Sequence, residues 1–213
     1  MHILITGGNR GIGLGLAAHY RAAGHAVTAT SRDGATGVAL DVADAGSVRA
    51  MAGQIAEPVD LLVCNAGVFH DRDEALAGGY GADMWAETFA ANVTGVFLCV
   101  QALLPNLRAA DGAKVAIISS QMGSSTKAPG NALIYRASKA AALNLGINLS
   151  AALRPEGIAV GIYHPGWVRT DMGGDAAAIA VAESVAGLSA RFAALDLATT
   201  GCFENWDGRP HAI

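Results

Sequence analysis

The first thirteen residues constrain the fold of this chain more than any other part of the sequence. A continuous apolar run, "HILIT" at 2–6, leads directly into the glycine-rich segment "TGGNRGIG" at 6–13. An apolar run without alternation is typical of a strand buried on both faces of a parallel sheet. Glycines between such a strand and a helical sequence indicate a tight turn. The sequence therefore predicts a chain that opens with a strand, a turn and a helix.

Short β-branched runs and alanine-rich stretches alternate along the rest of the chain. Strands are expected at 2–6, 26–31, 37–42, 59–65, 114–119, 158–164 and 202–206, and helices at 12–23, 45–55, 81–108, 131–153 and 176–190. A parallel sheet with helices on both faces accommodates this alternation. We predict an α/β fold with a doubly wound parallel sheet of about seven strands, in a single domain over residues 1–213.

Composition limits the partners and the location. Of the 213 residues, 52% are hydrophobic and 15% are charged, as in a globular chain with one well-filled core. A net charge of −4 is the opposite of the basic face that nucleic-acid binding requires, so we expect no nucleic-acid partner. Three scattered cysteines, and a start too short for the apolar core of a signal peptide, predict no disulfide framework, no metal site and a cytoplasmic location.

The stretch 88–107 carries no charge and is long enough to cross a bilayer. Several polar side chains interrupt it, and Pro105 lies near its end. We therefore expect a buried helix or a contact surface between subunits here, and no membrane span.

The glycine-rich turn predicts a nucleotide site. Gly7, Gly11 and Gly13 allow the backbone to turn tightly and allow a pyrophosphate to approach the N-terminus of the following helix, where free N–H groups favour anions. The strand before the turn and the helix after it are the context that this motif requires. The sequence therefore predicts nucleotide binding at this turn.

Residues 135–139 read "YRASK", which places Tyr135 and Lys139 one helical turn apart on the same face. Reduction of a carbonyl by hydride needs a proton donor at the carbonyl oxygen. A free phenol has a pKa of about 10, and a cation within about 4–6 Å lowers such a pKa. The pair is predicted to be an acid–base couple, in which Lys139 lowers the pKa of Tyr135; the alternative is an ordinary surface pair.

Together these motifs resemble the short-chain dehydrogenases/reductases. The resemblance covers essentially the whole chain and is carried, in order, by "TGGNRGIG" at 6–13, "DV" at 41–42, "NAG" at 65–67, "NVTG" at 92–95, "SS" at 119–120, "YRASK" at 135–139 and "HPGWVRT" at 164–170. Within the family, the segments 118–124, 135–144 and 164–174 look most similar to compact carbonyl reductases of the sniffer type and to the C-factor-like bacterial proteins.

The resemblance implies that the catalytic residues are Ser120, Tyr135, Lys139 and Asn92. Ser120 would orient the substrate oxygen, and Lys139 would also hold the hydroxyls of the nicotinamide ribose. Asn92 would hold a water in a proton relay to Lys139, and its alternative role is that of a helix asparagine bonded to the backbone.

The catalytic serine has alternatives because Ser120 precedes Tyr135 by fifteen positions, a longer spacing than is usual in the family. The loop between them absorbs an insertion. The alternative hydroxyls are those of Ser119, Ser124 and Ser125.

The resemblance also implies that residues 1–213 form an NAD(P)-binding Rossmann domain with a set of cofactor-binding residues, several of them backbone contacts. The set is Thr6, Gly7, Asn9, Arg10, Gly11, Ile12, Gly13, Ser31, Arg32, Asp41, Val42, Asn65, Ala66, Gly67, Tyr135, Lys139, Pro165, Gly166, Val168 and Thr170. Asp41 would contact the adenine ring, with helix capping as its alternative role. Thr170 would meet the nicotinamide carboxamide.

The end of the second predicted strand favours NADP(H). An NAD site usually carries an acidic residue there, whereas this chain has Ser31 and Arg32, with Arg10 in the glycine turn as a second arginine. Arginine pairs with phosphate through two parallel hydrogen bonds. Asp33 keeps NAD(H) open as the alternative, because a shift by one residue would bring its carboxylate to the ribose.

The predicted function is NADP(H)-dependent oxidoreduction of a small-molecule carbonyl or alcohol substrate through Ser120, Tyr135 and Lys139. The alternative is a catalytically idle NAD(P)-binding regulatory or signalling protein of the same fold. The segment after Thr170 is expected to fold over the site and shape the pocket. By resemblance, the chain is expected to form a homo-oligomer, either a dimer or a tetramer, with a monomer as the alternative.

Overall fold

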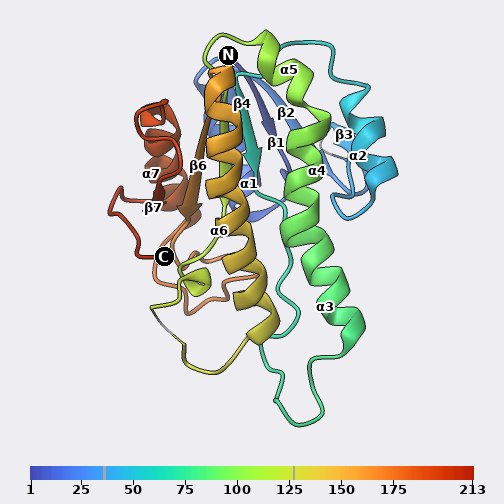
Figure 1. Cartoon of the computed structure of the whole chain (residues 1–213), viewed down its shortest axis with the longest axis vertical. Coiled ribbons are helices and arrows are strands. Elements are labelled where there is room, and N and C mark those ends of the chain that lie inside the picture. The colour runs from blue at the N-terminus through green and yellow to red at the C-terminus, as the bar shows by residue number, and fades with distance from the viewer. Residues whose placement is uncertain (36, 127) are drawn as a thin grey trace.

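One parallel sheet forms the centre of the molecule. In this computed structural model, which describes residues 1–35, 37–126 and 128–213, seven strands pair in the order β3-β2-β1-β4-β5-β6-β7. The strands are β1 (His2–Ile5), β2 (Ala26–Ser31), β3 (Val38–Ala39), β4 (Leu61–Cys64), β5 (Lys114–Ile118), β6 (Ala159–His164) and β7 (Phe203–Asn205). All these pairings are parallel (Figure 1). The predicted doubly wound sheet is confirmed.

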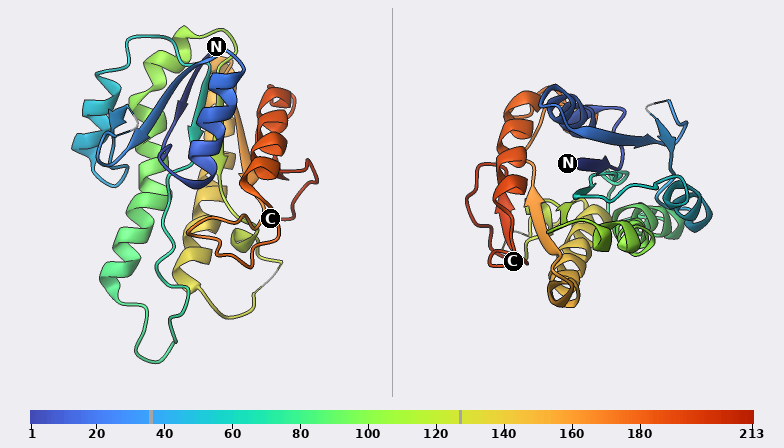
Figure 2. Two further views of the ribbon diagram at one scale, coloured as in Figure 1. Left: turned by 180° about the vertical axis from the view of Figure 1, so that it is seen from behind. Right: turned by 90° about the horizontal axis from the view of Figure 1, so that it is seen from above.

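Helices cover both faces of this sheet. One face carries α1 (Gly11–Ala22) and α7 (Val181–Ala194), which pack against each other. The opposite face carries α2 (Ala45–Ala52), α3 (Ala82–Phe89), α4 (Gly95–Ala102), α5 (Leu104–Ala109) and α6 (Leu133–Leu153). The right-hand view of Figure 2, from above, shows the helices on the two sides of the sheet. Short helical turns of other kinds are the π-helical segment η1 (Ala90–Thr94) and the 3-10 turns η2 (Gln121–Gly123) and η3 (Arg154–Glu156).

Successive side chains of a strand enter opposite cores. Ile3 and Ile5 of β1 belong to the apolar cluster that includes Leu16 of α1 and Leu188 of α7, whereas Leu4 belongs to the cluster beneath α2 and α4. All three strand residues are fully buried. Burial of an aliphatic side chain of this size contributes about 2 kcal/mol. Because both faces of β1 are covered, the strand needs no polar alternation, which explains the continuous apolar run.

The helix predicted over 81–108 is interrupted twice, although Figure 1 shows its parts as one long rod. The first interruption is η1, where the hydrogen bonds widen to the π pattern, and the second falls at Leu103, between α4 and α5. Pro105 in the first turn of α5 explains the second, because proline has no N–H to donate to the preceding turn. The prediction of one continuous helix was therefore wrong.

The carboxyl ends of the parallel strands all lie at one edge of the sheet. There β1 meets the glycine-rich turn, β4 meets the segment from Asn65, β5 meets Ser119 and Ser120, and β6 meets Pro165. Ligands of open α/β sheets bind outside this edge. Within the described residues, no helix is long and apolar enough to span a membrane, and no group of three or more metal-binding side chains gathers in those same ranges.

Candidate active site

The glycine-rich turn leaves the N-terminus of α1 accessible. Gly7 and Gly11 adopt φ angles of +68° and +53°, which side chains other than glycine rarely tolerate. A Cβ on Gly13 would lie 2.1 Å from the carbonyl oxygen of Gly7. Arg10 precedes the helix without capping it through its side chain, and the first turn of α1 contains no acidic residue. The first N–H groups of α1 are therefore arranged as an anion site requires.

The "NAG" segment at 65–67 forms hydrogen bonds that stabilise the glycine-rich turn. Asn65 donates its side-chain amide to the carbonyls of Thr6 and Gly7, at 2.9 and 3.0 Å. The Thr6 hydroxyl in turn accepts from the backbone N–H groups of Asn65 and Ala66, each at 3.0 Å. The Asn65 amide is thus engaged with the protein backbone, and its role in this geometry is to hold the turn in shape.

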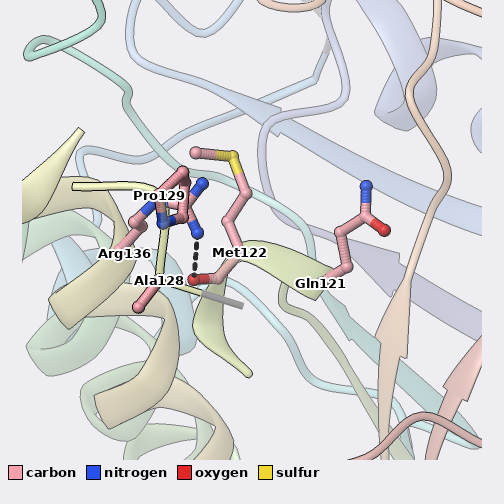
Figure 3. Close-up of a pocket in the computed structure, with 5 residues that line it drawn as sticks. All are labelled: Gln121, Met122, Ala128, Pro129 and Arg136. Carbon is pink, nitrogen blue, oxygen red and sulfur yellow. Dashed lines mark hydrogen bonds between the residues drawn. The ribbon is translucent and has the colours of Figure 1, made fainter. Parts of the chain in front are cut away.

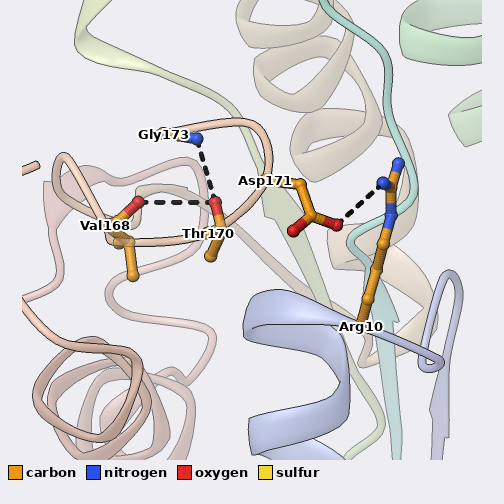
Figure 4. Close-up of polar contacts among 5 residues, drawn as sticks. All are labelled: Arg10, Val168, Thr170, Asp171 and Gly173. Carbon is orange, nitrogen blue, oxygen red and sulfur yellow. Dashed lines mark hydrogen bonds and ion pairs between the residues drawn. The ribbon is translucent and has the colours of Figure 1, made fainter. Parts of the chain in front are cut away.

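The segment 165–173 lies against the same turn from the other side. A Cβ on Gly11 would be 3.2 Å from the Thr170 methyl group. The Thr170 hydroxyl accepts from the N–H of Gly173 at 3.0 Å and donates to the carbonyl of Val168 at 3.4 Å (Figure 4). The Asp171 carboxylate forms an ion pair with the Arg10 guanidinium of the glycine-rich turn, with 3.2 Å between nitrogen and oxygen, and both side chains are exposed. The structure thus brings together the first and last of the predicted cofactor segments.

The residues that follow β2 form a turn of their own. Ser31 ends the strand and donates its hydroxyl to the carboxylate of Asp33 at 2.6 Å, and the N–H of Ala35 donates to the same oxygen at 3.1 Å. The hydrogen bond from Ser31 is the largest cause that lowers the pKa of Asp33. Arg32 is exposed beside them. The Asp33 carboxylate is therefore hydrogen-bonded to residues of the turn that contains it.

Asp41 and Val42 follow β3 at the same edge of the sheet. The Asp41 carboxylate accepts from the N–H of Ala43 at 3.0 Å, whereas α2 is capped by Asp44, which accepts from the N–H of Gly46 at 2.8 Å. The alternative role of Asp41 as the helix cap was therefore wrong. A Cβ on Gly95 would lie 2.6 Å from the Val42 carbonyl, so α4 packs closely beneath this segment.

Tyr135 and Lys139 lie in the first two turns of α6, and both are buried. The Lys139 ammonium lies 5.6 Å from the centre of the Tyr135 ring and donates to the carbonyl of Ile118 at 3.0 Å. Lys114, the other lysine that the structure describes, binds the carbonyls at the end of α7 and lies outside the site. Lys127, in the loop between Ser120 and Tyr135, falls outside the described residues.

Burial controls the proton affinities of this pair. It raises the pKa of Tyr135 to about 12, against smaller lowering effects from a hydrogen bond with Ser120 and from the charge of Arg72. Burial also lowers the pKa of Lys139 to about 8. The net shift of the Tyr135 pKa is therefore upward in this structure, because removal of the phenol from water has the largest effect. The lowering effect of Lys139 on this pKa stays a prediction.

Among the four candidate serines, Ser120 has the hydroxyl that interacts with the phenol. Its oxygen also accepts from the N–H of Met122 at 3.1 Å, which orients it. The Ser119 hydroxyl donates to the backbone carbonyl of Lys139 at 3.0 Å. Ser124 pairs with Thr126 at 2.8 Å, and Ser125 is exposed. The positions of these hydroxyls favour Ser120.

The side chain of Asn92 is occupied by protein partners. It accepts from the N–H of Val68 at 2.8 Å and donates to the carbonyl of Val68 at 2.9 Å and to the Ser138 hydroxyl at 3.0 Å. Asn92 lies in η1, where the widened turn brings it to the loop after β4. This arrangement is that of the backbone-bonded asparagine, and it ties η1 to the loop and to α6.

A cavity of about 460 Å³ borders the catalytic segments. Gln121 and Met122, which follow Ser120, line it together with Arg136, which follows Tyr135, and with Ala128 and Pro129 (Figure 3). The Arg136 guanidinium donates to the Met122 carbonyl at 3.4 Å. This cavity is a candidate for part of the substrate site.

Sequence reasoning missed Phe69 and Asp71, which both contact the candidate catalytic tyrosine. The Phe69 ring stacks on the Tyr135 ring, with centroids 4.2 Å apart and planes at 20°. Asp71 is fully buried and accepts from the backbone N–H of Tyr135. Their position shortly after the "NAG" segment, which follows the end of β4, was the only sign in the sequence that they could lie near the site. Their contact with Tyr135 joins residues far apart in the sequence, so no local pattern predicts it.

Gly123 controls how closely η2 approaches α6. A Cβ on Gly123 would lie 2.6 Å from the carbonyl carbon of Lys139 and 2.7 Å from the nitrogen of Ala140, both backbone atoms.

Replacing Gly123 with alanine should therefore lower the free energy of unfolding by about 1–3 kcal/mol, because the turn η2 that follows Ser120 must move away from α6. Urea unfolding measures this. Gly81→Ala is the matched control, since a Cβ there meets nothing within 4 Å; equal stability of the two variants would contradict the prediction.

The sheet, the glycine-rich turn at its carboxyl edge and the helix that begins there define a dinucleotide-binding α/β protein. The comparisons with known proteins specify the family. The chain belongs to the short chain dehydrogenase family, whose model matches residues 1–179. It is thus an NAD(P)-dependent oxidoreductase of the short-chain dehydrogenase type.

Relatives and solved structures agree with this placement. The chain is 41% identical to C-signal of Myxococcus xanthus over 153 residues, which cover 71% of this chain and 90% of that protein. The structure matches an NADPH-bound carbonyl reductase from chicken fatty liver with a TM-score of 0.91 and 32% identity, covering 100% of this chain and 98% of the other. It matches the carbonyl reductase Sniffer of D. melanogaster with a TM-score of 0.92 and 26% identity, covering 100% and 99%. The resemblance predicted from the motifs is confirmed.

Proposed function

We propose that this protein reduces a small-molecule carbonyl with NADPH, and that Tyr135 is the proton donor. The observation that carries the proposal is the buried phenol at the carboxyl edge of the sheet, with the Ser120 hydroxyl and the Lys139 ammonium close to it. This arrangement provides a donor where negative charge develops on the substrate oxygen. When bound, NADPH supplies the hydride.

Other residues of the site have proposed roles in cofactor binding and in catalysis. The N-terminus of α1 and the glycine-rich turn would bind the pyrophosphate, and the segment around Thr170 would contact the nicotinamide end. Ser120 would orient the carbonyl oxygen toward Tyr135, and Lys139 would hold the ribose and supply positive charge as the phenol loses its proton. Asn92 fixes the loop after β4 against α6 through its three hydrogen bonds.

Burial affects the protonation of the proposed donor. With its pKa raised to about 12 by burial, the Tyr135 phenol carries its proton near neutral pH, as a donor to a carbonyl oxygen must. Oxidation of an alcohol would instead require the phenolate, whose fraction rises with pH.

The choice of NADPH rests on Arg32. Its exposed guanidinium follows the end of β2, where a 2′-phosphate would lie. The Asp33 carboxylate, the group that would favour NADH, is engaged by Ser31 and Ala35. The similar structure from chicken fatty liver is NADPH-bound, which agrees with this choice.

Titration of the purified protein with NADPH and with NADH tests the proposal, followed by the fluorescence of the reduced nicotinamide. NADPH should bind more tightly, and Arg32→Ala should weaken NADPH binding by about tenfold while NADH binding stays unchanged, because one charge-assisted contact is lost. Arg154→Ala, in η3 at the opposite edge of the sheet, is the matched control. Tighter binding of NADH by the wild type would assign the ribose to Asp33, and binding of neither would overturn the proposed function.

The cavity next to the catalytic segments suggests the class of substrate, and exposed apolar side chains on other helices suggest the assembly. The cavity beside Met122 and Pro129 suits a compact, mostly apolar carbonyl compound. We also propose that the chain acts as one domain and as a homo-oligomer. Phe97 on α4 and Trp85 on α3, 39% and 36% exposed, are apolar side chains for the contact between subunits.

A further inference from the structure

The helix that carries Tyr135 and Lys139 begins without a cap of its own. Ala132 precedes α6 with a φ angle of +50° and has no side-chain group that could accept a hydrogen bond. The loop after β4 supplies the missing acceptor. One carboxylate oxygen of Asp71 accepts from the N–H of Ile134 at 2.7 Å, and the two oxygens lie 3.2 and 3.3 Å from the N–H of Tyr135.

The same loop also contacts the ring of the tyrosine. Phe69 stacks on the Tyr135 ring at 4.2 Å, and the Arg72 guanidinium lies 4.8 Å above the Phe69 ring. Arg72 also donates to the carbonyl of Met172, in the segment that follows Thr170. Residues 69–72 thus contact the backbone of Tyr135, its ring face and the segment expected to close over the site.

A capping carboxylate often contributes only stability, about 1 kcal/mol for a typical helix N-terminus. Three observations distinguish Asp71 from such a cap. One of its hydrogen bonds goes to Tyr135 itself, and its neighbour Phe69 fixes the plane of the same side chain. Asp71 is also fully buried, so its charge acts on the phenol with little screening by solvent.

We propose that Asp71 is a positioning residue for catalysis, which sets both the place of the Tyr135 side chain and its affinity for the proton. The groups that face the phenol are Ser120 from the turn after β5, Lys139 from α6, and Asp71 and Arg72 from the loop after β4. Burial is the main cause that raises the pKa of Tyr135, the hydrogen bond with Ser120 and the charge of Arg72 lower it, and the Asp71 charge adds a smaller raising effect. The proposal rests on the proposed function only in taking this phenol as the proton donor.

Two substitutions separate the effect of the helix-capping hydrogen bonds of Asp71 from the effect of its charge on the phenol. Asp71→Asn keeps an oxygen that can accept from the N–H groups of α6 and removes the charge, so the helix stays capped while the phenol becomes more acidic. Asp71→Ala removes both. Asp44→Asn is the matched control, because the Asp44 carboxylate caps α2 in the same way by accepting from the N–H of Gly46, away from Tyr135.

The experiment measures kcat and KM for carbonyl reduction, NADPH binding, and the titration of the phenol by ultraviolet difference absorbance, with Tyr135→Phe variants as the reference spectra. Asp71→Ala should lower kcat by about 10- to 100-fold, with KM and NADPH affinity nearly unchanged. Asp71→Asn should recover much of that loss and move the titration of the phenol to lower pH. The control variant should change neither kcat nor the titration.

The result that overturns the proposal is a folded Asp71→Asn protein in which the phenol titrates as in the wild type. If Asp71→Ala does not fold, the asparagine variant alone decides. If the wild type reduces no carbonyl compound, the proposed function fails, whereas the absorbance titration still tests Asp71 independently.

Discussion

Tyr135→Phe should lower kcat for carbonyl reduction by about 10²–10⁴-fold, the range that general acid catalysis contributes. The substitution removes only the hydroxyl. The ring that stacks on Phe69 at 4.2 Å remains, and so does its burial in α6. The fold and the affinity for NADPH should therefore stay close to those of the wild type.

Turnover on a panel of carbonyl compounds, together with the NADPH titration, measures this effect. Tyr163→Phe is the matched control, because Tyr163 is a fully buried tyrosine on β6 that packs against Phe192, away from the proposed site. The control should keep its kcat. Unchanged turnover in Tyr135→Phe would show that another group donates the proton. A wild type that binds NADPH but has no turnover would instead favour the idle regulatory protein.

Lys139→Met should make the protein more stable while it lowers kcat by about 100-fold. Burial lowers the pKa of Lys139 from 10.5 to about 8, so the charged form is held in the folded protein at a cost of at most about 3 kcal/mol below pH 8. Methionine removes that cost, although it leaves the carbonyl of Ile118 without its partner at about 1 kcal/mol. The loss of turnover follows because one preorganised charge near the reacting oxygen is removed.

The difference in stability between Lys139→Met and the wild type should depend on pH. Between about pH 8 and 10.5 the unfolded chain binds a proton that folded Lys139 has lost, so the stability of the wild type rises with pH through that window. Methionine has no such proton. The stability advantage of Lys139→Met should be largest below pH 8 and should disappear above pH 10.5.

Urea unfolding at several pH values checks this, with Lys114→Met as the control. Lys114 donates to the carbonyls of Phe192 and Ala193 at the end of α7, so its loss should destabilise the protein and leave kcat unchanged. A Lys139→Met protein that is less stable than the wild type at pH 7 would contradict the prediction.

The local pattern of the sequence determined the fold and the first candidates for the site. The apolar run at 2–6, the glycines after it and the helical stretch that follows were sufficient for the first strand–turn–helix unit, because each depends on residues near in sequence. The spacing of Tyr135 and Lys139 likewise placed both on one helical face. The roles of the proposed site residues, the single domain and the assembly stay predictions.

The tertiary structure decided what depends on contacts between distant residues. The helix cap from Asp71 joins residues 63 positions apart, and Asn92 is occupied by Val68 and Ser138 from two other segments. No local pattern encodes such pairs. The proton affinity of Tyr135 belongs here as well, because it depends on how far the phenol is removed from water, and that burial exists only once the loop after β4, the turn after β5 and α6 have packed together.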